Sequence, residues 1–303
     1  LVLLAVLCLL AVPLLPRLLA RREVGIGGTV LLVVVVLVRL PLPGWPPDGW
    51  VLVACDVGQG DALVLNAGSG SAVVVDAGPD PRAVDRCLRR LGVSRVPLVV
   101  LTHFHSDHVG GLSGVLRRRE VGGIVVTPLA DPPEGVGLVR EVARAAGVPV
   151  SVAAYGSTWE VGPVALQVLW PTPDQPRAGP GDGSTANNAS VVLLGQVHDV
   201  RLLLSGDLEP EGQDALAGLL PGLTVDVLKV PHHGSRYQDL DFLLSLRARV
   251  ALVSVGADND YGHPSKETLA PLQAAGTEVL RTDIEGDLAV LEQRGQLLAV
   301  TSR

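Results

Sequence analysis

The sequence has no methionine, not even at position 1, and only 2 phenylalanines and 3 tyrosines among 303 residues. We therefore expect it to be a fragment of a longer polypeptide. Because single-stranded nucleic acids are commonly held by aromatic rings that stack on bases, this shortage predicts no stacking platform. Charged residues are also few, at 18%, and a net charge of −7 excludes a broad positive field that would attract nucleic acid. A polyanionic ligand would have to be held locally, by metal ions or a few basic side chains.

Cysteine is equally scarce. The three cysteines, Cys8, Cys55 and Cys87, show no regular spacing, which argues against a disulfide framework. Cys8 lies in an apolar segment, and we expect Cys55 and Cys87 to be buried thiols and not metal ligands.

The beginning of the chain is strongly apolar. Residues 1–20 are long enough to span a bilayer, and a second apolar stretch covers residues 25–45. We predict two transmembrane helices within residues 1–43, a linker at 44–50, and one folded domain at 51–303.

Basic residues between the two apolar stretches predict the orientation of this membrane region. They are Arg17, Arg21 and Arg22. Since short cytoplasmic loops carry an excess of arginine and lysine, this turn should face the cytoplasm and residues 51–303 the outer side. A cleaved signal peptide is the competing interpretation, and it fits less well because the basic residues follow the apolar stretch.

From residue 51 onward, short apolar runs alternate with glycine-rich turns and helical patterns. We predict helices at 81–91, 138–146 and 264–275. The predicted strands are 51–57, 62–66, 72–76, 97–102, 123–127, 164–169, 190–194, 201–205, 225–230, 250–255 and 288–291. Strands followed by helices, in two successive sets, indicate a layered α/β domain with helices outside packed sheets. A Gly/Pro/Ser-rich loop is expected at 174–188.

Residues 102–112, THFHSDHVGGL, place three of the chain's seven histidines and an aspartate directly after a predicted strand. In an extended chain, His103 and His105 point to the same side, while Asp107 and His108 follow the start of a turn. Imidazoles could thus hold one metal ion, and a carboxylate with an imidazole a second. A polar, solvated turn is the alternative explanation.

Two later strands also end in ligand-type residues. Asp207 follows one of them in LLLSGD, and His232 and His233 follow the other in VLKVPHHG. Three such strand ends suggest one rim of one site. A carboxylate such as Asp207 can bridge two cations, as two-metal hydrolases require.

These residues resemble the metallo-β-lactamase fold, whose His-x-His-x-Asp-His signature corresponds to residues 103–108, and Asp76 corresponds to a residue that braces the ligand loop. More narrowly, residues 51–290 resemble the C-terminal part of ComEC-type DNA internalization competence proteins. Seven motifs occur in family order: DVGQGDA (56–62), LTHFHSDHVGGL (101–112), NNAS (187–190), LLLSGD (202–207), LKVPHHGS (228–235), NDYGHP (259–264) and RTDIEGDL (281–288).

The resemblance implies an αββα sandwich after the end of a channel's membrane region, with a hydrolase domain that binds two divalent metal ions. Zinc, manganese and iron all suit such ligands. The predicted metal ligands are His103, His105, Asp107, His108, Asp207 and one of His232 and His233. Asp107, Asp207 and His263 are the predicted catalytic residues, with His263 stabilising or protonating the leaving oxygen unless it only caps the next helix. Predicted substrate-contacting or bracing residues are Asp56, Gln59, Asp61, Asp76, Asn187, Asn188, Ser190, Lys229, Asn259, Tyr261 and Arg281.

One departure from the superfamily is the missing histidine between the first cluster and Asp207. The only histidine in that interval is His198, which we predict to be an exposed turn residue. Asn187, Asn188 or Ser190 is expected to take its place. Basic residues that flank the motifs could grip a nucleic-acid backbone without sequence preference; they are Lys229, Arg236, Lys266 and Arg281.

Three functions remain open from the sequence. The first is a nuclease domain that degrades one DNA strand at the outer face of the cell membrane while the rest of the multi-pass channel polypeptide imports the other, single strand. The second is a non-catalytic domain that guides DNA. The third is a membrane-anchored phosphodiesterase that acts on another compound.

Overall fold

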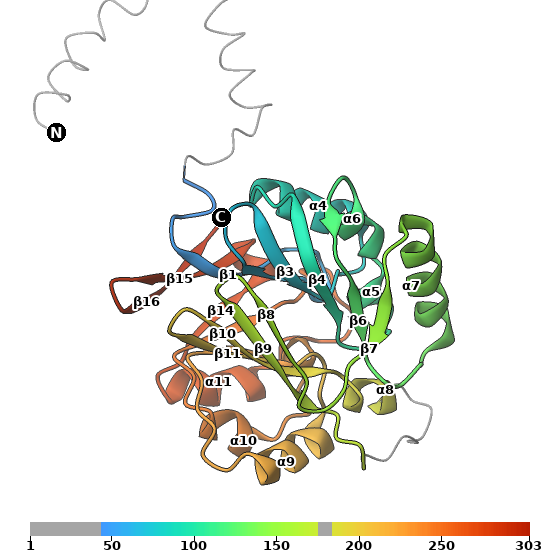
Figure 1. Ribbon diagram of the computed structural model, residues 1–303. Helices are drawn as coiled ribbons and strands as arrows, with labels where there is room; N and C mark the ends of the chain where they lie inside the picture. Colours follow the sequence, from blue (N-terminus) through green and yellow to red (C-terminus); the bar gives the residue numbers. More distant parts are fainter. Residues whose placement is uncertain (1–43, 175–183) are drawn as a thin grey trace, which may run out of the picture. The chain divides into compact units, whose positions relative to one another are not determined.

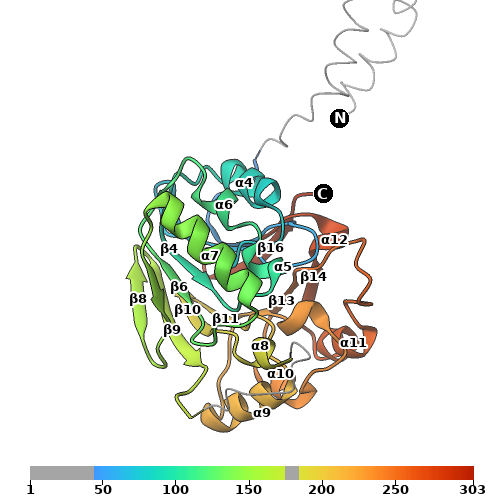
Figure 2. The same cartoon turned by 90° about the vertical axis from the view of Figure 1, so that its right-hand side faces the viewer.

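Alternate residues of the strands point into different cores, which explains why the strands read as unbroken apolar runs. In β4 (Arg95–Leu101), Leu98 and Val100 belong to one buried cluster, while Val99 and Leu101 belong to another. The computed structural model describes residues 44–174 and 184–303. The described residues fold as a four-layer sandwich in which two sheets face one another and helices cover both outer faces (Figures 1 and 2).

The first sheet has the strand order β16-β15-β1-β2-β3-β4-β6-β7, with β5 paired to β4. Its strands other than β4 are β1 (Trp50–Ala54), β2 (Leu63–Asn66), β3 (Ser71–Val75), β5 (Glu120–Val121), β6 (Ile124–Val126), β7 (Val150–Val152), β15 (Leu288–Gln293) and β16 (Gln296–Thr301). Its outer face is covered by α4 (Pro81–Arg90), α6 (Leu112–Leu116) and α7 (Pro133–Ala146), which share a core with it. The short α5 (Ser106–Val109) follows β4.

The second sheet has the order β14-β13-β12-β11-β10-β9-β8. Its strands are β8 (Thr158–Val161), β9 (Val164–Trp170), β10 (Val192–Val197), β11 (Val200–Leu204), β12 (Val227–Lys229), β13 (Val250–Val253) and β14 (Glu278–Arg281). Its outer face is covered by α9 (Pro210–Leu219), α10 (Leu240–Ser245) and α11 (Lys266–Ala274). Between its elements lie α8 (Ser184–Asn188), η1 (Pro231–Gly234) and α12 (Thr282–Glu285).

All eleven predicted strands are present, with shifted ends. His198 is exposed in the turn between β10 and β11, as predicted. The helix predicted from residue 138 begins earlier, because Pro133 suits its first turn. The helix predicted from residue 264 begins at Lys266, because the side chain of Ser265 caps it by accepting from the amide of Glu267.

Cys55 and Cys87 are both buried, but they form a disulfide, so the prediction of thiols is wrong. Their spacing of 32 residues gives no hint of the pairing. The bond forms because α4 lies across the end of β1, which brings the two Cα atoms within 6.0 Å.

The two predicted membrane helices at 1–43 lie outside the described residues. Within the described residues, no helix has the length and apolar character needed to cross a bilayer.

Candidate metal centre

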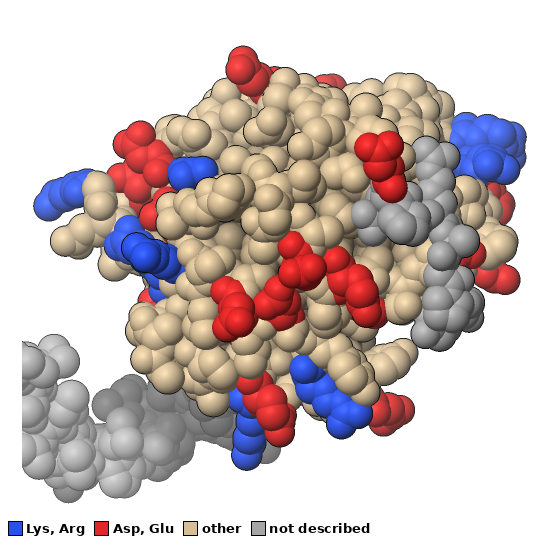
Figure 3. Space-filling model, turned by 90° about the horizontal axis from the view of Figure 1, so that it is seen from below, with Lys and Arg blue, Asp and Glu red and all other residues tan. Residues whose placement is uncertain are grey.

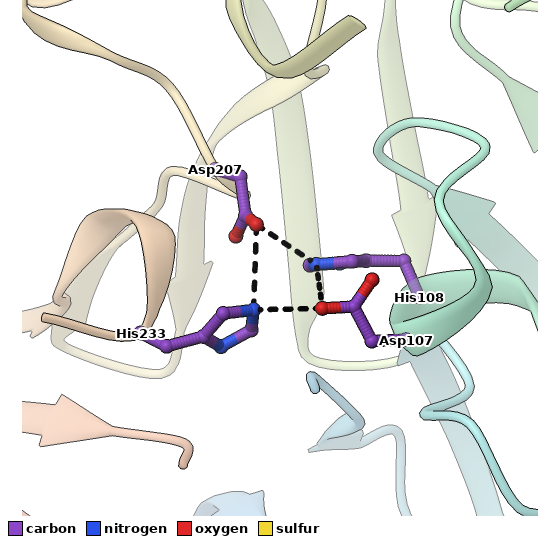
Figure 4. Close-up of side chains that lie close together, drawn as sticks. All are labelled: Asp107, His108, Asp207 and His233. Carbon is purple, nitrogen blue, oxygen red and sulfur yellow. Dashed lines mark ion pairs between the residues drawn. The ribbon is translucent and has the colours of Figure 1, made fainter. Parts of the chain in front are cut away.

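The ligand-type side chains come from loops that follow β4, β11 and β12, and thus from both sheets. Asp107, His108, Asp207 and His233 offer atoms that all lie within 4.8 Å of one another (Figure 4). His108 Nε2 lies 3.2 Å from Asp207 Oδ2, and His233 Nε2 lies 3.3 Å from both Asp207 Oδ2 and Asp107 Oδ2. The predicted convergence of three strand ends is therefore present in the structure.

Hydrogen bonds on the far side of each ring aim the Nε2 atoms inward. His108 donates from Nδ1 to Asp76 Oδ2 at 2.8 Å, and His233 donates from Nδ1 to the carbonyl of Ser254 at 2.8 Å. In the neutral ring, each Nε2 then carries a lone pair that can bind a metal ion, as in metal-binding histidines. His108 Nε2, His233 Nε2 and Asp207 Oδ1 are buried without a hydrogen-bond partner. This donor set of imidazoles and carboxylates fits a divalent cation such as zinc or manganese.

The charges of these groups reinforce one another. Burial opposes ionisation of Asp207, but the nearby His108 and His233 outweigh it and hold the pKa of Asp207 well below its usual range. Burial also disfavours the charged form of His108, but Asp207, Asp76 and Asp107 raise the pKa of this imidazole well above its usual range. A cation among the carboxylates would take the place of these imidazole protons.

A second group of histidines approaches the same carboxylate oxygen from other directions. His103 Nε2 and His232 Nε2 each lie 4.0 Å from Asp207 Oδ2, and His103 Nε2 lies 3.0 Å from His105 Nδ1. Asp207 Oδ2 thus lies within 4.0 Å of the Nε2 atoms of four histidines, His103, His108, His232 and His233. Of the two adjacent histidines, His233 belongs to the four-residue group, and His232 does not.

The backbone at the two adjacent histidines is left-handed, with φ of 47° at His232 and 52° at His233. Such φ values are uncommon for residues other than glycine and cluster at functional sites. The two rings both approach Asp207, although their centroids lie 6.2 Å apart and their planes are 71° apart.

Asp76 holds the segment from Thr102 to His108 in place through hydrogen bonds. Its carboxylate accepts from the amide and hydroxyl of Thr102, at 2.7 and 2.8 Å, and from His108. The carboxylate is buried, and it fixes the strand end and the imidazole in one geometry.

Asp61 and Lys229 form a buried ion pair beneath the site. Lys229 Nζ lies 2.8 Å from Asp61 Oδ2, and Asp61 Oδ1 lies 3.4 Å from His233 Nδ1. Burial opposes ionisation of Asp61, but Lys229 and His233 lower its pKa below the usual value. Lys229 has no exposed surface, so it is an internal counter-ion and does not grip a nucleic-acid backbone, contrary to the prediction.

The NNAS stretch supplies support where the superfamily normally has another histidine. Ser190 Oγ lies 3.3 Å from His103 Nδ1 and accepts from the amide of Asp207 at 3.2 Å. Asn187 donates to Glu209 Oε1 at 2.8 Å, and that oxygen lies 3.5 Å from His232 Nδ1. Asn188 instead accepts from the amide of Glu209 at 3.2 Å.

Sequence reasoning missed Glu209. A glutamate two residues after Asp207 and directly before α9 reads as an ordinary helix-start residue, and no motif marks it.

A cavity of about 820 Å³ opens onto the metal centre, and Gln59, Asn187, Tyr261 and His263 are among its lining residues. Burial and the neighbouring His232 and His233 lower the pKa of His263 to about 4. Its imidazole is therefore neutral near pH 7, which suits hydrogen bonding to a leaving oxygen better than proton donation. His263 does not cap α11, because Ser265 does.

Asp56, Asn259 and Arg281 are among the predicted site residues that do not line this cavity. Asp56 pairs with Arg303 at 2.7 Å, and Arg281 pairs with Asp283 at 2.5 Å. Asn259 braces its own loop through hydrogen bonds to Gly256 and His263.

Among the described residues that line the cavity, none is lysine or arginine. Five carboxylates line it: Asp107, Glu134, Asp207, Glu209 and Glu211. The lower face of the molecule, on which α9 lies, also shows a group of acidic side chains near its centre (Figure 3). Without cations, this cavity would repel an anionic substrate.

Comparison with known proteins shows the family to which the chain belongs. The model of the Metallo-beta-lactamase superfamily matches residues 55–256. "ComE operon protein 3" of Bacillus subtilis is 29% identical over 77% of this chain and 32% of its own length. "Competence protein ComA" of Neisseria gonorrhoeae is 28% identical over 93% of this chain and 38% of its own length. The chain thus spans about a third of each relative, and the resemblance to ComEC-type proteins is confirmed.

Solved structures are similar at lower identity. Zn(2+)-bound PqqB from Methylobacterium extorquens is 13% identical, with a TM-score of 0.49 over 76% of this chain and 98% of that chain.

Proposed function

Because this chain belongs to the metallo-beta-lactamase superfamily, we propose that it is a metal-dependent phosphodiesterase that degrades the non-imported DNA strand during natural transformation. The observation that carries the proposal is the group of Asp107, His108, Asp207 and His233, in which His108 Nε2, His233 Nε2 and Asp207 Oδ1 are buried without a hydrogen-bond partner. The similarity to ComE operon protein 3 and to the relative named as a competence protein supports a role in natural transformation.

The proposed centre holds two divalent ions, zinc or manganese. Asp107, His108 and His233 would hold one, His103 and His105 the other, and Asp207 would lie between them. When bound, such ions supply hydroxide from water at neutral pH and polarise a phosphoryl oxygen.

The chain's own residues orient this chemistry. Asp76 and the carbonyl of Ser254 fix the rings of His108 and His233, so that their Nε2 atoms face the centre. Ser190 supports both His103 and the backbone of Asp207. His263, at the cavity wall, would donate a hydrogen bond to the leaving oxygen.

We further propose that the domain lies on the outer side of the cell membrane, as part of a multi-pass channel polypeptide. The disulfide between Cys55 and Cys87 supports this, because such bonds persist in oxidising compartments and are rare in the cytosol.

The test is to incubate the full chain with single-stranded DNA in the presence of manganese or zinc. We expect cleavage that Asp207→Ala abolishes and that Asp199→Ala, at an exposed turn aspartate, leaves intact. Binding without cleavage under every metal would show a DNA-guiding domain instead. Activity confined to small phosphodiesters would show a different substrate.

A further inference from the structure

A second cavity of about 780 Å³ adjoins the metal cavity. Four residues line both cavities: His232, Tyr237, Tyr261 and His263. The two tyrosines therefore stand at the border, next to the candidate leaving-group histidine. Both lie in loops, one after η1 and one before α11.

The two cavities differ in charge. The metal cavity is lined by five carboxylates and, among described residues, by no lysine or arginine. The second cavity is lined by Arg236 and Lys266, with Glu267 as its one described carboxylate. Glu267 is turned toward the hydroxyl of Ser265, which donates to it. An anionic chain that leaves the metal cavity across the two tyrosines would thus meet the positive charges of Arg236 and Lys266.

The tyrosine rings are exposed to an unusual degree. Tyr237 is 59% exposed and Tyr261 73% exposed, although the chain has only 3 tyrosines. Arg236 lies over the Tyr237 ring, 4.8 Å from its centroid, and donates to its hydroxyl at 2.6 Å. Tyr261 stacks on His263 at 5.8 Å between centroids, with ring planes 27° apart. Arg236 and His263 thus hold the two rings in place, and each tyrosine keeps most of its surface accessible to solvent.

We propose that Tyr237, Tyr261, Arg236 and Lys266 form a subsite for the unpaired nucleotide next to the scissile phosphodiester. Stacking of bases on aromatic rings, together with cations along the backbone, is how proteins hold single strands without reading their sequence. This inference rests on the proposed function and departs from the prediction, made from composition, that the chain has no stacking platform.

Binding, measured apart from cleavage, tests the subsite. The full chain, loaded with manganese, is titrated into a fluorescein-labelled ten-nucleotide thymidylate strand with phosphorothioate linkages, which resist hydrolysis. A second strand has the same linkages but abasic sugars. Fluorescence anisotropy gives both dissociation constants, so the result does not depend on whether DNA is cleaved.

We expect Tyr237→Ala and Tyr261→Ala each to weaken binding of the thymidylate strand by about five- to 150-fold and to leave the abasic strand unchanged. Tyr237→Phe and Tyr261→Phe should restore binding, because the ring remains. Tyr155→Ala is the matched control, since Tyr155 is 47% exposed and lines neither cavity.

The charges are tested in the same assay. Arg236→Ala and Lys266→Ala should weaken binding of both the thymidylate and the abasic strand. Arg294→Ala, in the exposed β15–β16 turn, should weaken binding of neither. The proposal is wrong if the alanine variants of Tyr237 and Tyr261 have the same dissociation constants as Tyr155→Ala. It is also wrong if these variants weaken binding of the abasic strand, or of duplex DNA, as much as binding of the thymidylate strand. Loss of cleavage with retained tyrosine-dependent binding would overturn only the nuclease assignment.

Discussion

Removal of the buried lysine beneath the metal centre should destabilise the fold strongly. Lys229 and Asp61 are 0% exposed, and their charged atoms lie 2.8 Å apart. At an effective dielectric constant of about 20, Coulomb's law gives an attraction of about 6 kcal/mol at this distance. Desolvation of the two ions costs several kcal/mol each, so the pair contributes little net stability over an apolar pair.

Loss of one partner is different, because it leaves the other charge buried and unpaired. Lys229→Met should lower the free energy of unfolding by about 3–5 kcal/mol. The double variant with Asp61→Asn removes both charges and should recover at least about 2 kcal/mol of that loss. The chain has one other lysine, the exposed Lys266, and Lys266→Met is the matched control.

The assay is urea denaturation of the metal-free full chain, followed by circular dichroism. A loss below about 1 kcal/mol for Lys229→Met, or strictly additive effects in the double variant, would refute the buried-pair reasoning.

Three other perturbations test the structure. Reduction of the Cys55–Cys87 bond, which closes a loop of 32 residues, should lower the free energy of unfolding by about 4 kcal/mol. Thermal or urea denaturation measures this loss, and an unchanged midpoint would contradict the presence of the bond. Metal affinity measured by calorimetry should rise between about pH 6 and 8, because the raised pKa of His108 makes protons compete with the cation for the imidazole. Binding should release protons, and an affinity that does not change with pH would contradict this reasoning. Gly60→Ala should weaken metal binding, because its Cβ would lie 2.1 Å from a carbonyl of the ligand loop, whereas Gly58→Ala, with nothing within 4 Å, should not.

The sequence indicated which side chains come together because these side chains follow strand ends. Asp107, Asp207 and His233 each follow an apolar run that ends in a loop, and runs buried on both faces are easy to recognise. Where sheet strands end side by side, their loops meet, so local patterns alone indicated a common site.

Features that depend on packing between distant segments could not be read in this way. Lys229 ends a strand like any surface lysine, and only the position of Asp61 shows that it is internal. The disulfide depends on how α4 docks, and the platform of Tyr237 and Tyr261 depends on two loops that meet in space. The strand β7 was missed because three residues, Val-Ser-Val, are too few for an alternating pattern to stand out.

The carboxylate-lined cavity also fixes an order of events. The cavity is lined by five acidic side chains and, among its described lining residues, by no lysine or arginine. Without metal ions, it would repel phosphate groups electrostatically. Under the proposed function, cation uptake would therefore precede binding of the polymer, and the protein would keep its ions from one substrate to the next. A shortage of free metal ions would then prevent substrate binding, before any bond is broken.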